Sequence, residues 1–176
     1  EPCVGKSHLV RKLLQTGSWK FNQPKWVPHH ESEADQLVIL GRYDEPFQQF
    51  PGTDRLSMAV QPHALAFVRK AAGLGTNVLF EGDRLSNTKF IDSLRKHGVE
   101  VEVHFLMMSQ DLLSKRRAKE RTQNAGFIAR CKTKIKNIAM HVNGHKIPYK
   151  VWNVDSEEGR IALYWGICDT LGLKAS

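Results

Sequence analysis

A phosphate-binding sequence stands at the beginning of the chain, where the first residues end in Gly5-Lys6-Ser7. The run matches the loop G-x-x-x-x-G-K-[ST] except for its first glycine, which we expect immediately before Glu1, after the strand that feeds the loop. In such a loop the backbone amides point at phosphate oxygens, the lysine reaches the β- and γ-phosphates, and the hydroxyl binds Mg²⁺. The residues expected to hold a nucleoside triphosphate are Glu1, Pro2, Cys3, Val4, Gly5, Lys6 and Ser7.

Acidic residues follow two compact apolar runs that are typical of buried strands. The runs are 37–40 and 77–80, and the acids after them are Asp44, Asp54, Glu81 and Asp83. In an open parallel sheet ligands sit beyond the carboxyl ends of the strands, so these acids are expected near the phosphate loop. Glu81 or Asp83 would bind Mg²⁺ with Ser7, and Asp44 or Asp54 would take a proton from an attacking hydroxyl. The alternative is that they are ordinary loop acids paired with neighbouring arginines.

Positive charge is concentrated in residues 115–136, where nine basic side chains against one acid give +8, the net charge of the whole chain. The basic residues are Lys115, Arg116, Arg117, Lys119, Arg121, Arg130, Lys132, Lys134 and Lys136. An apolar stripe at helical spacing accompanies them: Ile128, Cys131, Ile135, Ile138 and Val142. We expect two basic helices with a turn or joint at 124–126. The plain alternative is a solvated helical face.

A basic lid over the site would suit phosphoryl transfer, which needs cations on the equatorial oxygens and exclusion of water. Arg117 and Arg121, four residues apart, would project together from one helix face. Arg116 or Arg130 would serve instead, and the spacing does not choose among them. Arg84, next to Asp83, is a further candidate for neutralising the developing charge.

The remaining segments predict helices and strands in alternation, and hence an α/β domain with a parallel sheet and helices on both faces. Helices are expected at 7–15, 62–72 and 87–96, from Ser109 onward, and after Asp155, whose spacing to Glu158 suggests a capping box. Further strands are expected at 99–108 and 146–154, but 18–36 yields only short extended pieces. His29 and His30 are interpreted as a surface pair, because no partner at metal-ligand spacing accompanies them. We expect one domain over 1–176, with the lid at about 110–142.

Composition limits the class of protein. The 176 residues are 41% hydrophobic, which suffices for one continuous core. No apolar run approaches the roughly 20 residues of a membrane span, so no membrane partner is expected. Three scattered cysteines favour a reducing cytoplasm over a disulfide framework. The net charge of +8 favours an anionic partner such as a nucleotide or a nucleic acid.

Together these segments resemble P-loop kinases of the nucleoside and thymidylate kinase type, and more closely the phage kinases that phosphorylate 5-hydroxymethyluracil in DNA during thymidine hypermodification. The resemblance runs from Glu1 to about Asn153. It rests on Leu40-Gly-Arg-Tyr-Asp44, on Gly52-Thr-Asp-Arg-Leu-Ser-Met-Ala-Val-Gln-Pro62, on Val78-Leu-Phe-Glu-Gly-Asp-Arg-Leu85 and on the lid stretch Arg116 to Ile138. It implies a three-layer P-loop kinase fold with strand order 2-3-1-4-5, ATP as the donor and a modified base in DNA as the acceptor.

Three functions are therefore open. The leading hypothesis is an ATP- and Mg²⁺-dependent kinase of the hydroxymethyl group of 5-hydroxymethyluracil in DNA, working in the host cytoplasm. The second keeps the enzyme class and changes the acceptor to a free deoxynucleoside or deoxynucleoside monophosphate. The third is a P-loop regulatory or DNA-binding module without catalysis.

Overall fold

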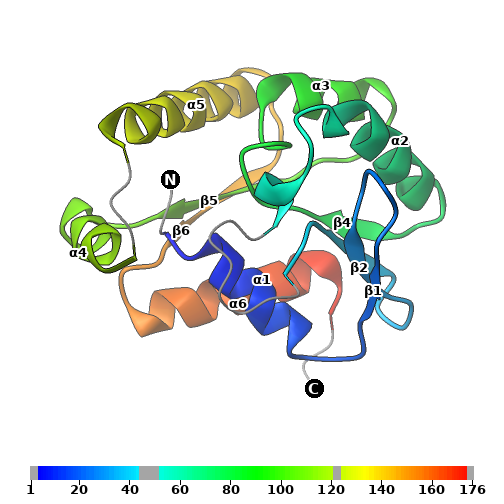
Figure 1. Ribbon diagram of the computed structural model, residues 1–176, viewed down its shortest axis with the longest axis horizontal. Coiled ribbons are helices and arrows are strands. Elements are labelled where there is room, and N and C mark those ends of the chain that lie inside the picture. Colours follow the sequence, from blue (N-terminus) through cyan, green and yellow to red (C-terminus); the bar gives the residue numbers. More distant parts are fainter. Residues whose placement is uncertain (1–3, 44–51, 121–123, 174–176) are drawn as a thin grey trace. The chain divides into compact units, whose positions relative to one another are not determined.

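The computed structural model describes residues 4–43, 52–120 and 124–173, apart from the side chains of Lys119 and Glu120. Two compact units make up the chain: one is Ser7–Glu100, and the other is Glu1–Lys6 with Val101–Ser176. In the described residues there are six α-helices and two sheets (Figure 1). The expected α/β class is thereby confirmed.

The unit Ser7–Glu100 contains a four-stranded mixed sheet with the order β1-β2-β3-β4. Its strands are β1 (Lys20–Asn22), β2 (His29–Ser32), β3 (Leu37–Leu40) and β4 (Asn77–Leu79). β1, β2 and β3 pair antiparallel, whereas β3 pairs parallel with β4. All four residues of β3 are buried, as its continuous apolar run predicted.

Three helices accompany this sheet: α1 (Lys6–Leu14), α2 (Val60–Gly73) and α3 (Thr88–Lys96). α2 buries Val60, Ala64, Val68 and Ala71, which recur at helical spacing. α3 begins where Asn87 accepts a hydrogen bond from the Phe90 amide at 3.0 Å. The short 3-10 turn η1 (Thr53–Arg55) precedes α2. These helices match the predicted ones to within a few residues.

The unit formed by residues 101–173 and the first residues contains β5 (Val103–Met107) and β6 (Tyr149–Asn153), which pair parallel. Its helices are α4 (Gln110–Glu120), α5 (Ala125–Gly144) and α6 (Glu157–Leu171). α6 packs against β6, and a Cβ at Gly166 would overlap the Trp152 ring, so only glycine leaves room for this indole. Ile138 and Val142 of the expected apolar stripe are buried in α5, and Asn124 caps that helix.

A single parallel sheet is not what the structure contains, because the first sheet is mixed and β5–β6 forms a separate one. The antiparallel strands come from residues 18–36, for which the sequence predicted only extended pieces. A tight turn joins β2 to β3, with the Gln36 amide donating to the Glu33 carbonyl at 3.3 Å. Strands that follow each other through so short a connection must pair antiparallel.

The interpretation of His29 and His30 as a surface pair is wrong. Both lie in β2 and are only 7% and 8% exposed. The Nδ1 atom of His29 lies 2.8 Å from the Val27 carbonyl oxygen, and the His30 ring stacks on Phe21 with centroids 4.6 Å apart. The His29 ring lies against Phe67 of α2, with centroids 4.6 Å apart, and these contacts between distant segments are not predicted by any local sequence pattern.

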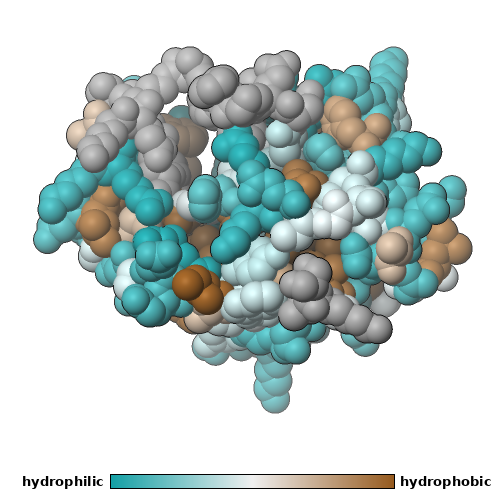
Figure 2. Space-filling view, turned by 90° about the horizontal axis from the view of Figure 1, so that it is seen from below, coloured by the Kyte–Doolittle hydropathy of each residue, from teal (hydrophilic) through white to brown (hydrophobic). Residues whose placement is uncertain are grey.

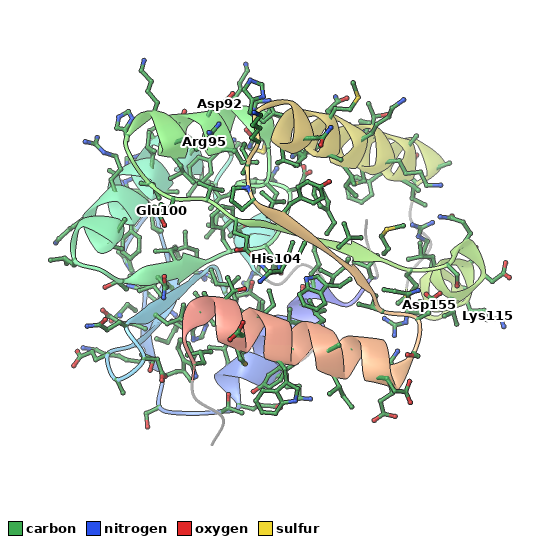
Figure 3. The ribbon with its side chains drawn as sticks, turned by 180° about the vertical axis from the view of Figure 1, so that it is seen from behind. Asp92, Arg95, Glu100, His104, Lys115 and Asp155 are labelled. Atoms are coloured by element: carbon green, nitrogen blue, oxygen red, sulfur yellow. The ribbon has the colours of Figure 1, made fainter. Side chains whose placement is uncertain are left out.

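The cap of α6 is also shifted by one residue. Ser156, not Asp155, is the N-cap, and its hydroxyl accepts from the Gly159 amide at 3.1 Å. Asp155 lies in the loop between β6 and α6 (Figure 3), where it accepts a hydrogen bond from the Ser109 amide at 2.8 Å. Asp155 therefore ties the ends of β5 and β6 together instead of capping the helix.

The exposed surface mixes polar and apolar residues. The face in Figure 2 is mostly hydrophilic, with separate hydrophobic patches between. The most exposed large apolar side chains are Met58, Leu74, Met140 and Met107. Among the described residues, no helix is both long and apolar enough to cross a bilayer.

A partly buried polar network surrounds His104 in the unit that contains β5 and β6. His104 lies on the side of β5 that faces α6 (Figure 3). Its Nδ1 accepts from the Trp152 indole at 3.0 Å, and its Nε2 lies 2.8 Å from Glu102 Oε1. Burial lowers the pKa of His104, so the folded state favours the neutral ring.

We expect the free energy of unfolding to fall as pH decreases below about 6.5, through the lowered pKa of folded His104, because the unfolded state then binds more protons. His104→Gln should show a shallower decrease. Urea unfolding at pH 7, 6 and 5 measures the free energy of unfolding of both proteins. The difference between the two proteins separates the contribution of His104 from that of the other histidines. Parallel curves for the two proteins would contradict this.

Candidate functional site

The centre of the candidate site is the carboxylate of Glu81, two residues beyond the end of β4. Its Oε1 atom accepts a hydrogen bond from the Ser7 hydroxyl at 2.8 Å and another from the Tyr43 hydroxyl at 3.2 Å. Ser7 is the second residue of α1, and Tyr43 follows β3. The loop serine and an acid after an apolar strand, predicted to share a metal ion, thus lie in direct contact.

A close approach of two backbone segments shapes this cluster of polar groups. Gly52 returns to the end of β3 by a bridge to Arg42, with amide-to-carbonyl distances of 2.8 and 3.2 Å. It has φ 77° and ψ −145°, a conformation that is almost confined to glycine. A Cβ at Gly52 would overlap Glu81 Oε1 and lie 2.7 Å from the Tyr43 hydroxyl. Glycine is therefore required where the backbone meets the carboxylate.

The turn η1 holds the loop that carries Glu81 and Asp83. Thr53 is fully buried, and its hydroxyl donates to the Glu81 carbonyl at 2.6 Å. Asp54 accepts a hydrogen bond from the Asp83 amide through Oδ1. Gly82 lies between these two bonds with φ 114°, and a Cβ there would be 2.6 Å from the Thr53 hydroxyl. Asp54 is consequently engaged in fixing the loop.

The buried hydroxyl of Tyr43 lies near two carboxylates and one guanidinium group. Tyr43 is 7% exposed, and its pKa is raised well above its ordinary value, first by burial and then by the negative charges of Glu81 and Asp54. The positive charge of Arg11, which lies on α1 one turn after Ser7, lowers the pKa of Tyr43 and so opposes part of this increase. Tyr43 therefore remains a neutral phenol at neutral pH and serves Glu81 as a donor.

Arg84 is half-buried beside η1. Its Nε donates to the Leu56 carbonyl at 3.4 Å, and its own carbonyl accepts from the Gln61 side chain at 2.9 Å. These contacts join the start of α2 to the loop after β4. Asp83, expected as a metal ligand, is exposed.

In the other unit, the phosphate-loop glycine lies beside an arginine of α4. Gly5 has φ 98°, and a Cβ at this position would be 3.6 Å from Arg116 Nη1. Val4 is buried and Lys6 half-buried, at the first residue of α1. Arg116 is one of the two alternatives to Arg117 and Arg121. Its position next to the loop backbone could not be read from helix spacing.

Several predicted residues lie outside the described part of the chain: Glu1, Pro2, Cys3, Asp44 and Arg121. Arg117 is described and half-buried in α4. Exposed basic side chains on α4 and α5 are Lys115, Arg130, Lys132 and Lys136. The structure thus brings together Ser7, Glu81 and Asp54, and it adds Tyr43 and Gly52, which the sequence analysis quoted only as part of a resemblance.

Any magnesium site here would be built from few protein ligands. Across the described residues, no three His, Cys, Asp or Glu side chains gather to hold a metal ion. Mg²⁺ in nucleotide sites is commonly held by one or two protein oxygens, phosphates and waters, so Ser7 and Glu81 fit this type of site. Searches against protein-family models, curated proteins and solved structures find no match to this chain.

The crowding at Gly52 predicts a large loss of stability on substitution. Gly75 is a matched control, because it also has positive φ, 73°, but nothing lies within 4 Å of its Cβ position. Gly75→Ala should cost about 1–2 kcal/mol from backbone strain alone. Gly52→Ala should cost about 1–3 kcal/mol more, because the methyl group displaces Glu81 or Tyr43. Denaturant unfolding measures both, and equal losses would show that the cluster does not constrain Gly52.

Proposed function

We propose that this protein is an ATP- and Mg²⁺-dependent kinase that phosphorylates the hydroxymethyl group of 5-hydroxymethyluracil in DNA. The observation that carries the proposal is the hydrogen bond from Ser7 to Glu81. A serine hydroxyl that gives its proton to a carboxylate keeps its lone pairs for a cation. This is what the Gly5-Lys6-Ser7 motif requires of its serine.

The fold supports the same proposal. In a P-loop kinase sheet of order 2-3-1-4-5, strands 2 and 3 pair parallel, and so do strands 4 and 5. In the proposed fold the parallel pairs β3–β4 and β5–β6 would correspond to these. We propose that β1 and β2 are additions at the outer edge of β3.

Each group has a defined task in the proposed reaction. The acceptor hydroxyl oxygen bonds to the γ-phosphorus of ATP, the bond to the β,γ-bridging oxygen breaks, and ADP leaves. Asp54 or Asp44 takes the proton of the hydroxyl. Lys6 binds the β- and γ-phosphates, and Ser7 with Glu81 or Asp83 holds Mg²⁺, which when bound would offset phosphate charge.

The arginines have a second task, which is to stabilise charge on the phosphoryl group in flight. Arg84, Arg117 and Arg121 were predicted for it from the sequence, with Arg116 or Arg130 as alternatives, and we favour Arg116 among the alternatives because its guanidinium lies beside Gly5. A base within duplex DNA must be flipped out before it can react, at a cost of a few kcal/mol. Exposed basic residues of α4 and α5 would offset this cost by contacting DNA phosphates.

The reaction can be tested with γ-labelled ATP and three acceptors: a duplex containing 5-hydroxymethyluracil, the same duplex with thymine, and free 5-hydroxymethyldeoxyuridine monophosphate. We expect label only in the first duplex. Lys6→Ala should lower the rate by about 10²–10³, the effect of losing one charge-stabilising group. Lys12→Ala, an equal change of charge on the same helix, is the control.

Each other outcome selects an alternative. Label in the free monophosphate would indicate a nucleotide kinase. If no acceptor is labelled, the proposal is wrong, and DNA binding that persists in Lys6→Ala would favour a module without catalysis.

Arg116 provides a separate prediction about nucleotide binding. Arg116→Ala should weaken the affinity for Mg·ATP about tenfold or more, since a charge-assisted hydrogen bond contributes about 1.5–3 kcal/mol. Lys115→Ala removes the same charge from the neighbouring, exposed position and should change the affinity less than twofold. Calorimetric titration measures both. Equal effects would mean that only the overall charge of α4 matters.

A further inference from the structure

We propose that Tyr43 is a positioning residue for the metal-nucleotide site, acting through Glu81 to fix the proton-accepting partner of Ser7. The inference rests on the proposed function and deepens it by adding a residue that neither the loop motif nor the acidic residues indicate. Its basis is geometric: one carboxylate oxygen, Glu81 Oε1, accepts from both Ser7 and Tyr43, at 2.8 and 3.2 Å.

The two hydroxyls come from different elements, so their shared acceptor is held from two directions. Ser7 belongs to α1, and Tyr43 follows β3. A rotation of the Glu81 side chain that keeps one bond must break the other. A carboxylate with a single donor could turn about that donor, whereas two donors on one oxygen define where it lies.

Tyr43 is itself held on several sides. The ring is buried, at 7% exposure, and it makes a tilted contact with the His30 ring, with centroids 5.9 Å apart. Gly52 closes the space at the hydroxyl, where an added Cβ would be only 2.7 Å away. A donor fixed in this way loses little further freedom when it binds Glu81.

The experiment is a double-mutant cycle on the full chain, with Tyr43→Phe, Glu81→Gln and the double variant, read by calorimetric titration with ATP in the presence and absence of Mg²⁺. Tyr43→Phe should weaken Mg·ATP binding about tenfold, the effect of one hydrogen bond to a charged group, and change Mg²⁺-free ATP binding less than twofold. In the Glu81→Gln background the same substitution should have no further effect on Mg·ATP.

Tyr164→Phe is the matched control, because Tyr164 is similarly buried, at 8% exposure, but lies on α6. It should leave both affinities unchanged. Additive losses in the double variant, or equal losses with and without Mg²⁺, would overturn the inference and leave Tyr43 a packing residue. If the wild-type protein binds ATP with the same affinity with and without Mg²⁺, the proposed function fails, and the inference fails with it. Unchanged binding in Tyr43→Phe alone overturns only the inference.

A second measurement covers the case in which Tyr43→Phe does not fold. The wild-type protein is sufficient for it: one of the three tyrosines should give a ring signal that changes when Mg²⁺ is added to the ATP-bound protein. Tyrosine-labelled NMR spectra recorded with ATP and with Mg·ATP detect it. No change in any tyrosine would overturn the inference.

Discussion

One carboxylate oxygen organises the described part of the candidate site. Glu81 Oε1 accepts two hydroxyl protons, while the backbone of the same residue is fixed by Thr53. For these bonds to form, the chain beyond β3 must return at Gly52, and glycine must stand where any side chain would overlap the carboxylate. A half-buried charge is stable in a folded protein only when it is paired or well hydrogen-bonded, and this arrangement supplies the donors.

Sequence reasoning found the elements whose signal is local. The apolar runs at 37–40 and 77–80 predicted β3 and β4. The acids that follow such strands were expected near the phosphate loop, and Glu81 does lie next to Ser7. β1 and β2 were missed because Lys20–Asn22 and His29–Ser32 contain few apolar residues, and their strands form by pairing along β3. Because these two strands were not predicted, the antiparallel part of the sheet was not predicted either.

The parts of the site that escaped prediction depend on distances between segments far apart in sequence. A tyrosine after a buried strand looks like an ordinary core residue, and only its 3.2 Å contact with Glu81 gives it another meaning. Asp54 remains an expected base, and the sequence did not reveal that its Oδ1 accepts a hydrogen bond from the Asp83 amide. Likewise, helix spacing favoured Arg117 and Arg121, whereas the loop geometry brings Arg116 to Gly5. The residue types were sufficient to suggest the chemistry, but the assignment of roles needs coordinates.

A structure determined with Mg²⁺ and a non-hydrolysable ATP analogue tests the central claim most directly. The account predicts the ion about 2.1 Å from Ser7 Oγ, the hydroxyl still donating to Glu81, and the β- and γ-phosphates against the amides around Gly5. An analogue bound away from Gly5-Lys6-Ser7, or an ion that contacts neither Ser7 nor Glu81, would contradict it.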